Sequence, residues 1–302
     1  MSLTDVPGVA VGHWTDLDGA TGVTVVSLPE PNRTAVEVRG AAPGTRETAL
    51  LAPGMRIENI QAIVFSGGSA YGLAAADGVV RELEKDGRGH ETMNGIVPIV
   101  PSAIVYDLGI GDPAARPGPE EGAAAYRAAT GDPVAMGSVG AGTGAVVGGW
   151  RGFRHFKKGG VGSHALEVDG VTVGALVVLN AVGDVFRLEG TPLTGGDPVP
   201  PLHGGSRPLG VNTTLVCVCT DASLSRPDLM RITVRSQDAL AACLRPGHTR
   251  YDGDAAFAVS CGERTVSPDA VGEAAFVVVG RAIEAAMRYA EPLAGIPAAE
   301  DP

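Results

Sequence analysis

The residue pair Asn212-Thr213 stands directly before a Val-rich apolar run, 214–220. Such a run, bounded by turn residues, predicts a buried strand. A Thr hydroxyl at the mouth of a strand sits on a rigid element, where a nucleophile can be positioned accurately. It is a weak nucleophile without an adjacent base, and a newly exposed N-terminal amine is one source of that base. A cut between Asn212 and Thr213 would therefore give Thr213 both groups. The plainer alternative is a Thr that simply begins a strand.

Three other side chains are candidates for chemistry. Asn180 ends the strand predicted at 171–179, where its amide can donate to a developing oxyanion or merely end the strand. His248 is a candidate base. His13, beside Trp14, is either a functional residue or a hydrogen-bonded structural histidine.

A glycine-rich turn, Ser66-Gly67-Gly68, follows the strand predicted at 60–65. A helix is predicted to begin at the N-cap Ser69 and to end at Gly87. A strand, a glycine turn and a helix N-terminus together can cradle an anion or an oxyanion. No Gly-Lys-Ser/Thr follows, so the turn is not a nucleotide-binding P-loop.

The elements that must position these residues are strands mixed with amphipathic helices, without regular βαβ alternation, which indicates an α+β protein. A hairpin turns at Asp169-Gly170, a strong two-residue turn signal, and a loop rich in Pro and Gly precedes the nucleophile at 189–209. Further strands are predicted at 19–28, 34–39, 96–108 and 256–261, and further helices at 119–130, 225–244 and 268–289.

Composition narrows the class of protein. The chain has 302 residues and 44% apolar residues, enough for a large core, and 44 glycines with only 4% aromatics predict close packing of small residues. The net charge of −11 argues against a nucleic-acid partner. No signal peptide or membrane-spanning segment is visible. Cys217 and Cys219 on one strand face, without nearby histidines, favour reduced thiols in a cytoplasmic protein over a metal site.

Several strings of the sequence resemble a known family. Asn-Thr-Thr-Leu at 212–215, followed by Cys-Thr-Asp-Ala at 219–222, is similar to the self-cleaving segment of the P1 peptidases, the D-aminopeptidase and β-peptidyl aminopeptidase group. The string at 66–73 and Val-Gly-His-Trp at 11–14 resemble other parts of the same family. The resemblance extends over nearly the whole chain.

The resemblance implies roles for particular residues. It makes Thr213 the N-terminal nucleophile, Asn212 the residue with the scissile carbonyl, and Asn180 the oxyanion donor. Asp252 and Asp254 match positions beside the nucleophile, where two carboxylates can orient the Thr213 amine and move a proton. Some relatives carry Ser and Glu there, so the division of labour between the two carboxylates stays open.

The substrate side of the site is also drawn from the resemblance. Tyr106 matches a position where some relatives place an aromatic hydroxyl near the substrate carbonyl and others a different aromatic residue. Ser66, Gly67 and Gly68 are expected to contact substrate. No metal or cofactor is implied.

The fold implied is a four-layer αββα sandwich of the P1 peptidase type, with the processed Thr between two sheets. Residues 1–302 would form one domain, cut into a large subunit, 1–212, and a small subunit, 213–302, of 302 − 212 = 90 residues. Strand 214–220 must then be central, which keeps the two pieces interleaved.

The function implied is that of an N-terminal-nucleophile aminopeptidase or amidase, acting on short peptides, amides or esters with a free amino end. Two alternatives remain: an acyltransferase of the ornithine acetyltransferase type, and a non-processing relative that serves as a binding or scaffold protein. The partners expected are a small peptide or amide substrate and further copies of the chain in a tetramer of processed protomers, with no nucleic acid and no membrane. Preference for L-, D- or β-amino-acyl groups is left open.

Overall fold

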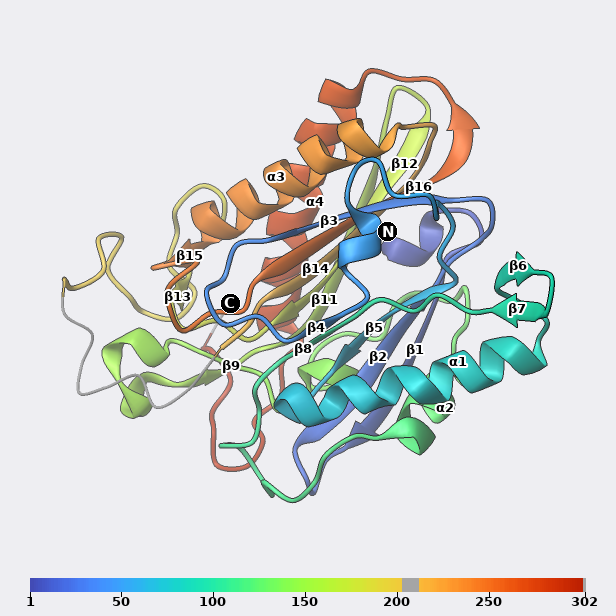
Figure 1. Cartoon of the computed structure of the whole chain (residues 1–302). Coiled ribbons are helices and arrows are strands. Elements are labelled where there is room, and N and C mark those ends of the chain that lie inside the picture. The colour runs from blue at the N-terminus through green and yellow to red at the C-terminus, as the bar shows by residue number, and fades with distance from the viewer. Residues whose placement is uncertain (203–211, 301–302) are drawn as a thin grey trace.

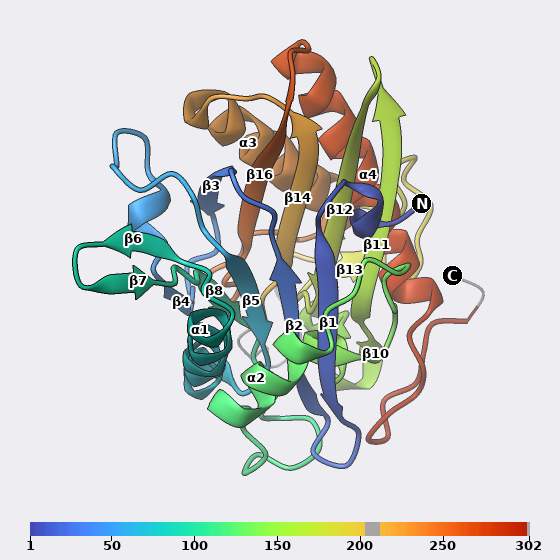
Figure 2. The same cartoon turned by 90° about the vertical axis from the view of Figure 1, so that its right-hand side faces the viewer.

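A computed structural model describes residues 1–202 and 212–300 of the chain (Figure 1). Two five-stranded sheets lie face to face, with one pair of helices covering the outer face of each (Figures 1 and 2). The predicted αββα sandwich is confirmed. Part of the Pro- and Gly-rich stretch predicted at 189–209 lies outside the described residues.

The first sheet has the strand order β1-β2-β5-β8-β4. Its strands are β1 (Ala10–Asp16), β2 (Thr21–Ser27), β5 (Ala62–Ser66), β8 (Ser102–Ile104) and β4 (Thr45–Arg46). The helices α1 (Ala75–Lys85) and α2 (Pro119–Arg127) pack on its outer face.

The second sheet has the order β11-β12-β14-β16-β3. Its strands are β11 (Gly160–Val168), β12 (Val171–Leu179), β14 (Leu215–Ala222), β16 (Ala255–Arg264) and β3 (Arg33–Val38). The prediction that the strand after Thr213 is central is confirmed, since β14 occupies the middle position. The helices α3 (Arg226–Cys243) and α4 (Pro268–Arg288) cover this sheet.

Among the residues that the structure describes, six short strands form three two-stranded sheets beside the two main sheets. They are β6 (His90–Thr92), β7 (Gly95–Val97), β9 (Val146–Val147), β10 (Lys157–Lys158), β13 (Asp184–Val185) and β15 (Leu244–Arg245). Within the described part of the chain, no helix combines the length and the apolar character needed to cross a bilayer.

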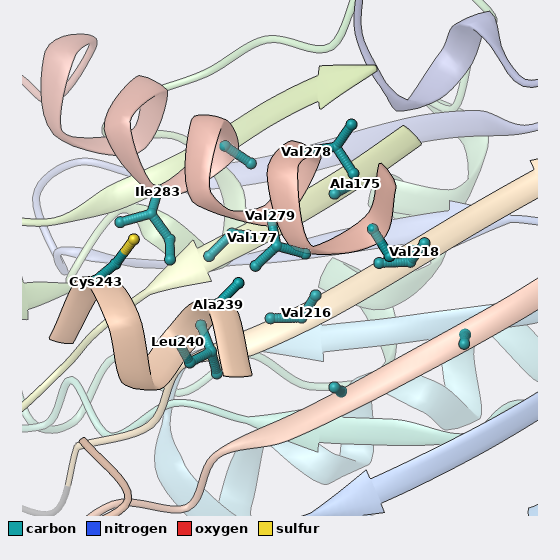
Figure 3. Packing of buried hydrophobic residues seen from close by; sticks show 14 of the residues in the cluster. Ala175, Val177, Val216, Val218, Ala239, Leu240, Cys243, Val278, Val279 and Ile283 are labelled. Carbon is teal, nitrogen blue, oxygen red and sulfur yellow. The ribbon is translucent and has the colours of Figure 1, made fainter. Parts of the chain in front are cut away.

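Strand β14 is buried on both faces, which explains its apolar sequence. Leu215 and Cys217 point into the core between the two sheets, whereas Val216 and Val218 pack under α3 and α4 (Figure 3). In the same inter-sheet core, Phe65 of β5 meets Phe257 of β16 with ring centroids 5.9 Å apart. Cys217 and Cys219 share one face, as predicted, with their sulfur atoms 3.8 Å apart.

Local signals are confirmed at two turns and corrected at a third. Asp169 and Gly170 have φ values of 49° and 79°, which suit a two-residue hairpin between β11 and β12. Gly87, with a φ of 70°, follows the end of α1 as predicted. The helix predicted to begin at Ser69 instead begins with a 3₁₀ turn, Ser69–Ala74, capped by left-handed Gly68, and Ser69 itself has a φ of 54°. Two successive left-handed residues prevent Ser69 from acting as an ordinary N-cap.

Candidate active site

Sheet topology brings three distant segments together at one end of the second sheet. Strands β14 and β16 are parallel neighbours with Leu215 opposite Ala255, so residues 212–214 and 252–254 enter side by side. Strand β12 runs antiparallel to β14, so Asn180, just past its end, meets the same point. The Thr213 N–H donates to the Asn180 carbonyl oxygen at 2.6 Å, and Asn212 pairs with Asp252. The residues proposed from the sequence as catalytic therefore lie together.

The hydroxyl of Thr213 is buried without a hydrogen-bond partner in the described part of the chain. The residue is only 1% exposed. Its Oγ1 faces Gly253, where an added methyl group would lie 2.7 Å from that oxygen. Buried hydroxyls are nearly always hydrogen-bonded, so one without a partner calls for an explanation. A nucleophile awaiting its reaction partner is one such explanation, although the hydroxyl of the neighbouring Thr214 also lacks a partner among the described residues.

The carbonyl group of Asn212 lies within a backbone frame. Its oxygen accepts a hydrogen bond from the Gly253 N–H at 2.8 Å, and the Asn212 N–H donates to the Tyr251 carbonyl at 2.9 Å. A backbone N–H aimed at a carbonyl oxygen stabilises the negative charge that develops there on nucleophilic attack. The carbonyl that precedes Thr213 is thus held and polarised.

Asn180 is completely buried and ties this frame to neighbouring loops. Its Nδ2 donates to the Tyr106 carbonyl at 3.2 Å, and its Oδ1 accepts from the Val146 N–H at 3.0 Å and from Asn212 Nδ2 at 3.4 Å. Tyr106 enters the network through its backbone carbonyl. The Asn180 side chain thus positions Asn212. That Asn180 donates a hydrogen bond to the oxyanion stays a prediction.

The two carboxylates have different surroundings. Asp254 Oδ1 accepts from the Thr214 N–H at 2.7 Å, and its Oδ2 lies 2.8 Å from His248 Nδ1. Asp252 accepts from the Thr249 N–H at 2.8 Å and from the Thr249 hydroxyl at 2.6 Å. Burial, followed by the charge of Asp254, raises the pKa of Asp252 to about 6, although the hydrogen bonds oppose the shift. The charge of Asp252 therefore changes around pH 6.

The two histidines weighed in the sequence occupy different places. His248 faces Asp254 with Nδ1. His13 lies on β1, where Nδ1 is 2.9 Å from the Thr24 hydroxyl. Burial lowers the pKa of His13 to about 4. His13 is thus a neutral histidine paired within the first sheet.

A buried lysine behind the site was not found from the sequence. Lys158 is 0% exposed, and its Nζ donates to the carbonyls of Thr143 and Ala145 at 2.7 and 2.6 Å. Burial lowers its pKa to about 7, against the opposing effect of the Asp107 charge. Its position before Gly159-Gly160 is the only hint of its burial in the sequence. Burial of a lysine depends on tertiary packing, which local sequence does not show.

The glycine turn at Ser66-Gly67-Gly68, predicted to cradle an anion, binds the side chain of Asp107. The Gly68 N–H donates to Asp107 Oδ1 at 2.7 Å, and the Thr21 hydroxyl donates to Oδ2 at 2.7 Å. Ser66 is buried and its hydroxyl donates to the Gly67 carbonyl. Contact of Ser66, Gly67 and Gly68 with substrate stays a prediction.

The model of peptidase family S58 matches residues 1–300. The chain belongs to this family. The resemblance to P1 peptidases is thereby confirmed, and membership supports peptidase or amidase activity.

Individual relatives agree with the family assignment. An uncharacterized aminopeptidase of Mycobacterium leprae is 42% identical, with 98% of this chain and 92% of that protein covered. A 6-aminohexanoate-oligomer endohydrolase of Paenarthrobacter ureafaciens is 30% identical, with 86% of this chain and 74% of that enzyme covered.

Solved structures show the same fold. An L-aminopeptidase D-Ala-esterase/amidase from Ochrobactrum anthropi, described as a variant of the Ntn hydrolase fold, has a TM-score of 0.79 at 23% identity, covering 99% of this chain and 91% of that one. A Burkholderia sp. β-aminopeptidase has a TM-score of 0.75 at 24% identity, covering 99% and 90%. At these identities the similarity bears on the fold alone.

Proposed function

We propose that this S58 chain cuts itself between Asn212 and Thr213 and that Thr213 then serves as an N-terminal nucleophile. One observation carries the proposal: the Thr213 hydroxyl, which has no hydrogen-bond partner among the described residues, lies beside the Asn212 carbonyl, whose oxygen accepts the Gly253 N–H at 2.8 Å. Thr213 thus supplies a nucleophile, Asn212 the carbonyl that it attacks, and Gly253 a donor for the oxyanion.

The cut proceeds through the hydroxyl of Thr213. Its oxygen adds to the carbonyl carbon of Asn212, and the proton it loses passes to the departing nitrogen of Thr213. The C–N bond breaks, leaving an ester between Asn212 and Thr213 Oγ1. The shift leaves the Thr213 amine free, and water then hydrolyses the ester, which frees the Asn212 carboxylate and restores the Thr213 hydroxyl.

Turnover reuses the same groups. The free amine of Thr213 accepts the proton from its own hydroxyl, which attacks the substrate carbonyl. The Gly253 N–H, together with Asn180, stabilises the oxyanion, and Asp252 exchanges protons with the amine. The Thr213 amine passes the proton that it took to the leaving nitrogen, the amine departs, and water releases the acyl group from Thr213.

The substrates we propose are short peptides, amides or esters with a free amino end. Relatives named as aminopeptidases and as an endohydrolase of 6-aminohexanoate oligomers support an amide of an amino-acyl group. The test is a panel of amino-acyl p-nitroanilides, supplied with and without excess ornithine. We expect p-nitroaniline release in water alone. Release only with ornithine would overturn the hydrolase assignment and favour an acyltransferase.

Asn180→Ala is expected to lower kcat by roughly 10²–10³-fold, the usual loss for one oxyanion donor. It should also slow self-cleavage, because Asn180 Oδ1 holds the Asn212 amide. Stopped assays on the purified variant measure the effect, with Asn94→Ala, at an exposed turn, as the matched control. Unchanged kcat with a lowered melting temperature would contradict the catalytic role.

A further inference from the structure

The imidazole of His248 lies between two hydrogen-bond acceptors. Its Nδ1 is 2.8 Å from Asp254 Oδ2, and its Nε2 is 3.3 Å from the backbone carbonyl oxygen of Gln237 in α3. The His248 side chain is 18% exposed, whereas that of Asp254 is 1% exposed. The ring thus closes the solvent side of a buried carboxylate.

Proton accounting favours the charged form of this ring. A backbone carbonyl can only accept a hydrogen bond, so Nε2 must carry a proton to bond Gln237. Asp254 already accepts the Thr214 N–H on Oδ1, and with Oδ2 also accepting, Nδ1 must carry a proton too. A neutral ring would set one nitrogen lone pair against an oxygen lone pair. With Asp254 ionised, both nitrogens are satisfied only in the imidazolium.

The charges around the ring agree with this assignment. The groups facing His248 are the Gln237 carbonyl from α3 and the carboxylates of Asp254 and Asp252 from the segment before β16. Burial by itself would lower the pKa of His248, but the hydrogen bond and charge of Asp254 outweigh it and raise that pKa. Among the described residues, His248 is the one basic side chain in an ion pair with either carboxylate.

We propose that His248 is a positioning residue whose imidazolium holds Asp254 as a carboxylate, and that Asp254 in turn fixes the Thr214 N–H and the nucleophile before it. The chain of contacts is continuous: His248 Nδ1 to Asp254, Asp254 Oδ1 to the Thr214 N–H, and Thr213 next along the backbone. The same positive charge favours the ionised form of Asp252. The proposal rests on the proposed role of Thr213. It assigns separate roles to the two carboxylates: Asp254 positions the nucleophile, and Asp252 exchanges protons.

His248 consequently does not act as the general base. Both of its nitrogens are engaged as donors, so neither has a lone pair free for the Thr213 hydroxyl. The Thr213 amine formed by cleavage remains the base.

The first test reads the charge of His248 without using activity. Nitrogen-15 NMR of histidine-labelled protein, with the signal assigned by its loss in His248→Asn, reports the protonation of each ring nitrogen. We expect both nitrogens protonated at pH 6.5 and a titration midpoint above 6.5 that falls in Asp254→Asn. A neutral tautomer at pH 6.5 would overturn the proposal.

The second test separates charge from packing through the pH profile of hydrolysis. The wild-type rate is expected to fall on an acid limb as the Thr213 amine and then Asp252, whose pKa is about 6, become protonated. His248→Asn, which suits the left-handed φ of 52° at this position, removes the positive charge and should move this acid limb upward by about one pH unit, a roughly tenfold slower rate on the limb. His248→Lys keeps a positive charge and should return the limb towards its wild-type position.

Controls keep this test distinct from that of the proposed function. His155→Asn removes an exposed histidine and should keep the wild-type profile. If the wild-type chain remains uncut and inactive, the proposed function fails. If it is cut and active, but His248→Asn and His248→Lys slow it equally without moving the limb, His248 is merely structural and this inference fails.

Discussion

Thr213→Ala is expected to abolish both self-cleavage and hydrolysis, the largest effect of any single change. The substitution removes the oxygen that attacks the Asn212 carbonyl and, after cleavage, the substrate. Denaturing electrophoresis and p-nitroanilide assays on the purified variant measure the two losses. Thr213→Ser keeps a hydroxyl and should retain cleavage.

Thr214→Ala is the matched control for this change. Thr214 is also buried, but its contact with Asp254 is made by the backbone N–H, which alanine keeps. Cleavage should therefore persist. Hydrolysis surviving in Thr213→Ala would mean that the nucleophile is another residue, and the cysteines would be the next candidates.

Gly253→Ala is expected to slow self-cleavage and turnover by roughly 10³-fold. An added methyl group would lie 2.6 Å from the Ala42 carbonyl oxygen and 2.7 Å from Thr213 Oγ1, so one of these atoms must move. The shift would displace the nucleophile and the N–H that polarises the Asn212 carbonyl. Loss of one oxyanion donor costs about 10²–10³-fold, and misplacement by about 1 Å costs about 10²-fold.

Gly131→Ala serves as the control for Gly253→Ala, because an added methyl group there meets no atom within 4 Å. Its cleavage rate should equal that of the wild type. Single-turnover cleavage of freshly refolded protein measures both variants. A Gly253→Ala rate within a few-fold of the wild type would remove Gly253 from the mechanism.

Much of the fold was accessible from the sequence because its signals are local. The hairpin at Asp169-Gly170 and the doubly buried strand after Thr213 follow from turn chemistry and from apolar pattern. The start of α1 could not be predicted, because the preference of Ser for the N-cap position does not reveal that Gly68 and Ser69 both take a left-handed backbone conformation.

The site itself was accessible only in part. Thr213, Asn180 and the two aspartates were grouped through resemblance, whereas their contacts arise from the parallel pairing of β14 with β16, which pairs segments far apart in sequence. The burial of Lys158 and the capture of the Gly68 N–H by Asp107 depend on packing between distant loops. Likewise, only the folded chain reveals that both nitrogens of His248 face acceptors.

Denaturing mass spectrometry of the freshly purified protein tests the central claim most directly. Self-cleavage predicts two fragments, residues 1–212 and 213–302, the smaller with Thr213 as its N-terminal residue. Thr213→Ala, purified in parallel, should give only the full-length mass. A wild-type chain that remains a single species after prolonged incubation at neutral pH, with no fragment beginning at Thr213, would contradict the account.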